Sequence, residues 1–161
     1  MAVEGGEITV REYTPGGASG NLPALVYFHG GGWVLGNVEG HNTLCARLAA
    51  GSGCRVFSVD YRLAPEHPYP AAIEDCTAAY RALLEEVAPS SLVVAGDSAG
   101  GGATLATVVA LRDAGDPLPA CLYLMSPWTD LTLSGETHQT RKSVDPLVPR
   151  GGIDGHLQLM D

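Results

Sequence analysis

The stretch Ser91-Leu-Val-Val-Ala-Gly-Asp-Ser-Ala-Gly-Gly-Gly102 decides the fold. Its first half, Leu92 to Ala95, is a short apolar run rich in valine, which predicts a buried strand. The apolar residues after the glycine-flanked Ser98 recur at helical spacing and predict a helix that ends before Gly115. A strand, a tight turn that carries a serine and a helix together form the context of a nucleophile elbow.

The turn at Ser98 requires small residues two positions before and two positions after the serine, because the chain bends sharply there. Gly96 and Gly100 meet this requirement. The chain contains 21 glycines, so a chance glycine-rich turn between a strand and a helix is the alternative interpretation. The strand before the turn and the helix after it favour the interpretation of Ser98 as a nucleophile.

The rest of the chain alternates predicted strands with predicted helices. Strands are expected at residues 7–13, 24–28, 55–60 and 120–126, and helices at 42–51 and from 71 to before Pro89. This alternation predicts an α/β protein whose sheet is mainly parallel and has helices on both faces. At 161 residues the chain is one domain by size, with a sheet core over 1–126 and a cap-like segment over 127–161.

Composition argues against several classes of function. The net charge is −9 and no basic patch is present, so nucleic acid is not expected as a partner. No Cys or His pair has ligand spacing, so neither a metal nor another cofactor is expected. No apolar run is long enough to span a membrane, and the acidic start predicts no leader peptide. Four cysteines without CxxC pairs predict reduced thiols and a cytoplasmic location.

A second glycine-rich stretch, His29-Gly-Gly-Gly32, follows the predicted strand 24–28 directly. Successive glycines let the backbone approach a ligand closely and leave N–H groups free. Beside Ser98, two such groups can bind a developing oxyanion, and each contributes about 3–4 kcal/mol to lowering the barrier. The alternative is a phosphate-binding loop, but neither nucleotide signature is present. We interpret His29 as a hydrogen-bonding residue that shapes this loop rather than as a general base.

Three blocks together resemble the hormone-sensitive-lipase-like (bacterial family IV) esterases of the α/β-hydrolase fold. They are Tyr27-Phe-His-Gly-Gly-Gly-Trp33, Asp60-Tyr-Arg-Leu-Ala-Pro-Glu66 and Gly96-Asp-Ser-Ala-Gly-Gly101, in the family's order and spacing. The resemblance implies an α/β-hydrolase fold with a mainly parallel, doubly wound sheet. It also implies hydrolysis of small carboxylic esters with short to medium acyl chains.

The resemblance implies a role for each matched residue of the site. Ser98 corresponds to the nucleophile, and the backbone N–H groups of Gly31, Gly32 and Ala99 correspond to the oxyanion hole. The supporting residues that the resemblance implies are His29, Gly30, Gly96, Asp97 and Gly100. The 60–66 block is expected to be structural, with Arg62 and Glu66 tied into a polar network, and Trp33 and Trp128 are either part of an acyl pocket or core residues.

The family's triad acid and histidine follow the sixth strand of the fold, near the ends of two further strands. The 35 residues after Ser126 leave too little room for two more strand–helix units, because one crossover takes a dozen or more residues. We therefore expect the sheet to be incomplete at its C-terminal edge and the triad Asp and His to be missing.

Two pairs still keep the order Ser–Asp–His within the chain. His156, with Asp145 or Asp154, is the candidate substitute base. The other formal pairing places Asp130 or Glu136 before His138.

Three functions fit these features. The chain is the N-terminal part of an esterase whose remaining part was lost, cleaved or supplied by another chain as a complementing C-terminal fragment, or it is a naturally short esterase that recruits a different base. The third is a non-catalytic binder of small molecules or an inactive fragment on the same fold. An uncovered apolar strand at 120–126 favours pairing with another chain, including a second copy in a homo-oligomer.

Overall fold

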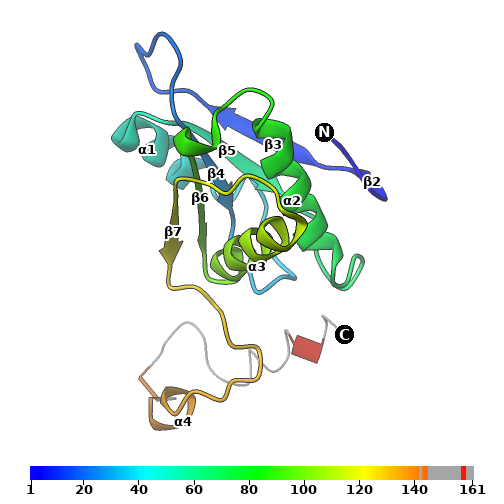
Figure 1. The fold of residues 1–161 in the computed structure, drawn as a ribbon. Coiled ribbons are helices and arrows are strands. Elements are labelled where there is room, and N and C mark those ends of the chain that lie inside the picture. The colour runs from blue at the N-terminus through cyan, green and yellow to red at the C-terminus, as the bar shows by residue number, and fades with distance from the viewer. Residues whose placement is uncertain (142, 145–156, 159–161) are drawn as a thin grey trace.

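A five-stranded sheet forms the centre of the protein in the computed structural model, which describes residues 1–141, 143–144 and 157–158 (Figure 1). The strand order is β3 (Thr9–Tyr13), β5 (Arg55–Asp60), β4 (Ala24–Phe28), β6 (Leu92–Asp97) and β7 (Cys121–Met125). Only β3 runs antiparallel to its neighbour in this sheet. A separate hairpin pairs β1 (Ala2–Val3) with β2 (Gly6–Glu7). The prediction of a mainly parallel sheet is confirmed.

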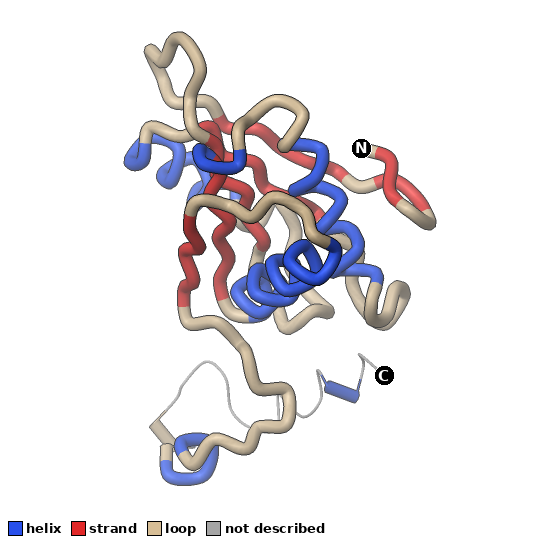
Figure 2. The backbone as a smooth tube through the Cα atoms, in the orientation of Figure 1, coloured by secondary structure: helices blue, strands red, loops and turns tan. Residues whose placement is uncertain are grey.

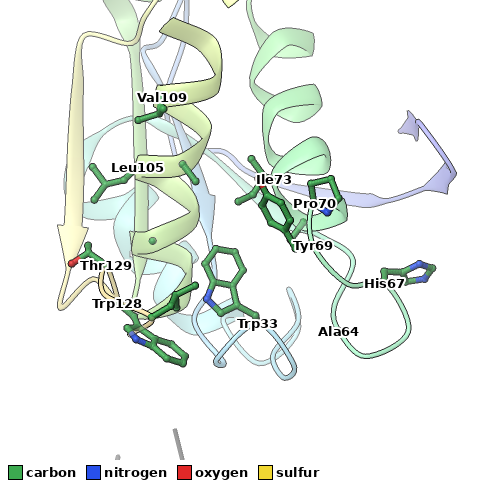
Figure 3. A pocket seen from close by; sticks show the side chains of 14 residues that line it. Trp33, Ala64, His67, Tyr69, Pro70, Ile73, Leu105, Val109, Trp128 and Thr129 are labelled. Atoms are coloured by element: carbon green, nitrogen blue, oxygen red, sulfur yellow. The ribbon is translucent and has the colours of Figure 1, made fainter. Parts of the chain in front are cut away.

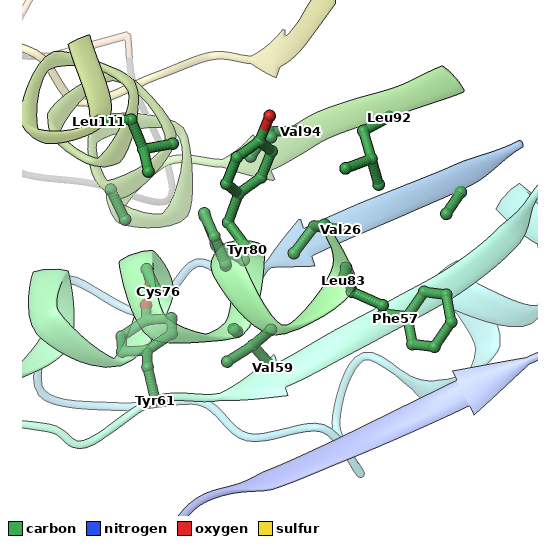
Figure 4. Packing of buried hydrophobic residues seen from close by; sticks show 14 of the residues in the cluster. Val26, Phe57, Val59, Tyr61, Cys76, Tyr80, Leu83, Leu92, Val94 and Leu111 are labelled. Carbon is green, nitrogen blue, oxygen red and sulfur yellow. The ribbon is translucent and has the colours of Figure 1, made fainter. Parts of the chain in front are cut away.

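Helices cover both faces of the sheet, as predicted (Figures 1 and 2). Helix α1 (Asn42–Ser52) packs on one face, and α2 (Ala71–Leu83) and α3 (Ala99–Ala114) pack on the other. Successive side chains of β4 alternate between the two faces, so that Val26 belongs to the α2–α3 cluster and Tyr27 to the α1 cluster. Figure 4 shows the α2–α3 cluster, which contains the larger part of the buried core.

Several element boundaries differ from the sequence-based expectation. The first predicted strand divides into β2 and β3, which belong to different sheets. Helix α3 begins at Ala99, directly after Ser98, because the serine itself has a positive φ and cannot be part of the helix. The 3-10 turn Pro89–Ser91 and the four-residue helix α4 (Thr137–Thr140) are too short to produce an apolar period in the sequence.

A buried ion pair fixes the loop between β5 and α2. The Arg62 guanidinium donates from Nη2 to Asp75 Oδ1 at 2.8 Å and from Nε to Oδ2 at 2.9 Å, and the Arg62 N–H bonds the same carboxylate. Asp75 is completely buried, whereas Glu66 is exposed. The expected polar network around Arg62 therefore uses Asp75 on α2 instead of Glu66.

Strand β7 lies at the edge of the sheet. Among the described residues it pairs only with β6, and Tyr123 at its centre is 51% exposed. After β7 the chain leaves the layered core and leads to α4, which is set apart from the sheet (Figure 1). The division into a sheet core and a cap-like segment remains a prediction.

The free edge of β7 leads us to expect association of the chain. Replacing Tyr123 with lysine places a charge on the edge, which disfavours strand pairing with another chain. We expect the unmodified chain to associate with increasing concentration and Tyr123→Lys to associate less, as measured by light scattering. An unmodified chain that stays monomeric at high concentration would contradict this expectation.

Candidate active site

Ser98 occupies a strained turn between β6 and α3. Its backbone has φ 51° and ψ −119°, a region that residues other than glycine rarely adopt. Hydrogen bonds from two directions hold this conformation. The Ser98 N–H donates to Met125 O at 3.0 Å, and the Ser98 carbonyl accepts from the N–H groups of Gly102 at 3.1 Å and Trp128 at 2.8 Å. The turn therefore has the geometry of a nucleophile elbow.

The flanking glycines are required because the backbone segments around Ser98 approach closely. A Cβ on Gly96 would lie 2.3 Å from Gly100 O, and a Cβ on Gly100 would lie 2.1 Å from Phe28 O. The second contact places the first turn of α3 directly against the end of β4. It thereby brings the elbow beside the glycine loop that follows β4.

The glycine loop presents free backbone donors. Gly31 has φ 132° and Gly32 has φ 63°, and a Cβ on Gly31 would lie 2.0 Å from Leu35 O. Within the described part of the chain, the N–H groups of Gly31, Gly32 and Ala99 make no hydrogen bond. Ala99 is the first residue of α3, so its N–H also lies at the positive end of the helix dipole. These three donors are the groups that an oxyanion would need.

Asp97 connects the elbow to the glycine loop. Its Oδ1 accepts a hydrogen bond from the Gly30 N–H at 2.8 Å and another from the Tyr27 hydroxyl. Burial, followed by the contact with Asp97, raises the pKa of Tyr27 and keeps that hydroxyl protonated. A Cβ on Gly30 would lie 2.3 Å from Asp97 Oδ2, so glycine is required where the loop meets the carboxylate.

His29 is buried inside the loop and makes no hydrogen bond to Ser98. Its Nδ1 lies 2.8 Å from the Gly30 carbonyl oxygen, an acceptor, so Nδ1 carries the proton. Its Nε2 is buried without a hydrogen-bond partner among the described residues. Burial lowers the pKa of His29, and the hydrogen bond to Gly30 partly opposes this shift. The imidazole is thus a neutral donor to the loop backbone.

No described residue accepts the Ser98 proton. Ser98 Oγ makes no hydrogen bond to a described side chain or backbone group. The candidate base His156 and its candidate acids Asp145 and Asp154 lie outside the described residues. Asp130, from the other formal pairing, accepts hydrogen bonds from Thr132 and Ser134, whose hydroxyls lower its pKa. The Asp130 carboxylate therefore stabilises the loop of residues 130–134.

Within the described ranges, no three His, Cys, Asp or Glu side chains gather in a way that could hold a metal ion. None of the helices there has the length and apolar character needed to cross a membrane. The four cysteines are free thiols, with Cys45 and Cys76 buried.

Comparison with known proteins agrees with this geometry. The family model described as alpha/beta hydrolase fold matches residues 25–160. The chain belongs to this family. Its resemblance to the hormone-sensitive-lipase-like branch is confirmed by an esterase of the bacterial hormone-sensitive lipase family, with 37% identity and a TM-score of 0.87 over 99% of this chain and 57% of that one.

Two further relatives support the assignment. A carboxylesterase of Mycobacterium tuberculosis is 43% identical over 94% of this chain and 49% of its own length. A hyperthermophilic esterase from the archaeon Pyrobaculum calidifontis superposes with a TM-score of 0.92 and 38% identity, over 99% of this chain and 54% of that one. The chain therefore spans about half the length of the relatives it matches.

An apolar cavity of about 350 Å³ lies between α2 and α3 in this alpha/beta hydrolase chain (Figure 3). Trp33 from the glycine loop and Trp128 from the segment after β7 both line it. The remaining lining residues are Ala64, His67, Tyr69, Pro70, Ala72, Ile73, Gly102, Leu105, Ala106, Val109, Thr129 and Leu131. The two tryptophans thus line a pocket, which was one of the two alternatives expected for them.

The helical part of this pocket is not visible in the sequence pattern. Ile73, Leu105 and Val109 follow the same apolar helical spacing as the core residues of α2 and α3. No local signal separates the two groups, because the spacing reports which side of a helix is apolar and not what covers that side.

The contact between Gly100 and β4 predicts a large effect of a single methyl group. Gly100→Ala forces a Cβ against the carbonyl oxygens of Phe28 and His29, so we expect a loss of about 1–3 kcal/mol or more in the free energy of unfolding. Gly51→Ala is the matched control, since a Cβ there meets nothing within 4 Å and alanine favours the helix. Chemical denaturation of both variants measures the difference, and equal stabilities would contradict the proposed contact.

The buried imidazole predicts a pH dependence of stability. The pKa of His29 lies below its ordinary value of 6.5 in the folded chain, so the unfolded chain binds a proton first as the pH falls. Stability from this group is complete above pH 6.5 and decreases below it, by up to about 1.4 kcal/mol per pH unit. His29→Gln should flatten the unfolding free energy below pH 6.5. The exposed control His67→Gln should not, and an identical pH profile for both variants would refute the assignment.

Proposed function

We propose that this chain carries the nucleophile and the oxyanion hole of a carboxylic ester hydrolase, with short to medium acyl esters as substrates. One observation carries the proposal: the α3–β4 contact brings the strained Ser98 turn beside a loop in which the Gly31 and Gly32 N–H groups are unpaired among the described residues. The names of the esterase relatives support the same reaction class.

The reaction follows from these positions. The Ser98 oxygen attacks the ester carbonyl carbon, and the carbonyl oxygen becomes an oxyanion that accepts from Gly31, Gly32 and Ala99 N–H. Such donors act without reorganisation, because the fold has already oriented them. Collapse of this intermediate expels the alcohol, which takes up the proton that the Ser98 hydroxyl gave up on attack, and leaves an acyl-Ser98 ester. Water then hydrolyses that ester and releases the carboxylic acid.

The cavity between α2 and α3 supports the proposed preference for short to medium acyl chains. Trp33 is joined to the glycine loop, and Gly102 lies one turn of α3 beyond Ser98, so both connect the cavity to the reacting serine. Its lining is almost entirely apolar, and its volume is near the lower end for ligand pockets. A short or medium hydrocarbon chain fits both properties.

The general base is the part of the mechanism that the described residues do not supply. We infer that the triad Asp and His come from another chain or from a C-terminal part, with His156 as the alternative within this chain. We further infer a cytoplasmic location for the protein from its four free cysteines.

The decisive experiment combines labelling with turnover. A p-nitrophenyl alkylphosphonate should add one phosphonyl group to Ser98, seen by intact mass spectrometry. Hydrolysis of p-nitrophenyl butyrate should be weak. We expect a rate about 10³–10⁴-fold above that in water, which is the enhancement that serine proteases retain when triad members are removed.

The matched variants are Ser98→Ala, which should abolish labelling, and Ser91→Ala, an exposed serine before β6 that should not affect it. Efficient Ser98-dependent turnover would show that a base is present, and its loss in His156→Ala would identify it. Absence of labelling together with retained binding of an apolar ester would overturn the proposal in favour of a non-catalytic binder.

A further inference from the structure

Tyr61, the first residue after β5, makes two contacts with His29. The two rings stack with centroids 4.3 Å apart at an interplanar angle of 12°, and the Tyr61 hydroxyl donates to the His29 carbonyl oxygen at 2.6 Å. Tyr61 is only 2% exposed, and burial raises its pKa well above the usual value. The hydroxyl therefore remains a hydrogen-bond donor.

The Tyr61 hydroxyl helps to fix the orientation of the peptide unit between His29 and Gly30. In a trans peptide the carbonyl and the N–H of one unit point in opposite directions. The His29 carbonyl accepts from Tyr61, and the Gly30 N–H donates to Asp97 Oδ1 at 2.8 Å. This peptide plane is thus held from both sides and cannot rotate without breaking a buried hydrogen bond.

The stacked ring acts on the next peptide unit. His29 Nδ1 donates to the Gly30 carbonyl at 2.8 Å, which fixes the unit that contains the Gly31 N–H. That N–H points away from the imidazole, because it lies opposite the Gly30 carbonyl. The imidazole stacks on Tyr61 at 4.3 Å and on His41 at 5.3 Å, and the Tyr61 ring is the nearer and more nearly parallel of the two. Tyr61 thus helps to set the direction of the Gly31 N–H through His29.

The segment around Tyr61 also holds the far end of the loop. The Ala64 N–H donates to the Trp33 carbonyl at 3.0 Å, and Asp60 Oδ1 accepts from the Val38 N–H at 3.0 Å. The chain from Asp60 to Ala64 therefore contacts the loop at its start, at its end and just beyond it.

From these contacts we propose that Tyr61 is a positioning residue for the oxyanion hole, which orients the Gly31 N–H by clamping the backbone of residues 29–31. The inference rests on the proposed function of Ser98. It assigns a role in the reaction to a residue block that the sequence suggested was only structural.

The test uses the full chain and the variant Tyr61→Phe, which keeps the stacked ring and removes the hydroxyl. Tyr80→Phe is the matched control: Tyr80 is completely buried, and its hydroxyl donates to the Pro117 carbonyl at 2.9 Å, far along α2. Both variants remove one hydroxyl that donates to a backbone carbonyl, so a purely structural effect should be similar in both.

The first readout is the reaction of Ser98 with a p-nitrophenyl methylphosphonate at alkaline pH. The Ser98 oxygen bonds to phosphorus, p-nitrophenolate leaves with its electron pair, and the serine proton passes to solvent. We expect the maximal rate of labelling to fall at least about tenfold in Tyr61→Phe and to change less than about twofold in Tyr80→Phe. The reagent concentration at half-maximal rate should stay the same in both variants.

The second readout is amide hydrogen exchange followed by NMR, which does not depend on Ser98 reactivity. The Gly30 amide should exchange at least about tenfold more slowly than that of exposed Gly16 in the unmodified chain, and Tyr61→Phe should remove most of this protection. Tyr80→Phe should leave it in place.

The outcomes separate the two proposals. Unchanged labelling and unchanged Gly30 exchange in folded Tyr61→Phe would overturn the role of Tyr61. An unprotected Gly30 amide in the unmodified chain would overturn it as well. An unmodified chain that is not labelled at Ser98, but whose Gly30 exchange responds to Tyr61→Phe, would contradict the proposed function and support the clamp.

Discussion

The arrangement of the site depends on a contact that only glycine permits. Gly100 in the first turn of α3 lies against the carbonyl oxygens of Phe28 and His29, where a Cβ would be 2.1 Å and 2.6 Å from them. Without a side chain at this position, a helix from one strand–helix unit and a loop from another can meet at backbone distance. Ser98 on the first unit and the free N–H groups on the second are neighbours for this reason. The parallel order of β4 and β6 aligns them, and Gly100 allows them to close the remaining gap.

The same region stores conformational strain and unmet hydrogen bonding. Ser98 and Trp33 have positive φ values of 51° and 68°, which residues other than glycine rarely adopt, and three N–H groups lack partners among the described residues. Features of this kind cost folding free energy and persist only where surrounding contacts enforce them. Here the enforcing contacts are the Asp97 carboxylate on the elbow side and the Asp60–Ala64 segment on the loop side. The large apolar clusters on both faces of the sheet provide the stability that tolerates this cost.

The sequence predicted the parts of the protein that local patterns determine. Strands 24–28 and 55–60 match β4 and β5 because short apolar runs are bounded there by Pro, Gly and charged residues. The elbow was predictable because its strain demands glycines at fixed offsets from Ser98. The sequence did not identify Asp75 as the partner of Arg62, since Asp75 is thirteen positions away and meets Arg62 only once the loop has folded against α2. The stacking of Tyr61 on His29 and the cavity between the helices also arise from tertiary packing, which leaves no periodic trace in the chain.

The end of β7 and the segment after it hold Ser98 through main-chain hydrogen bonds. The Met125 carbonyl and the Trp128 N–H bond the backbone of Ser98, and neither bond involves a side chain. Backbone hydrogen bonds specify the path of a chain but not the identity of its residues. The positions around 125–128 can therefore accumulate substitutions, including ones that reshape the cavity wall at Trp128, while the frame of the serine stays in place.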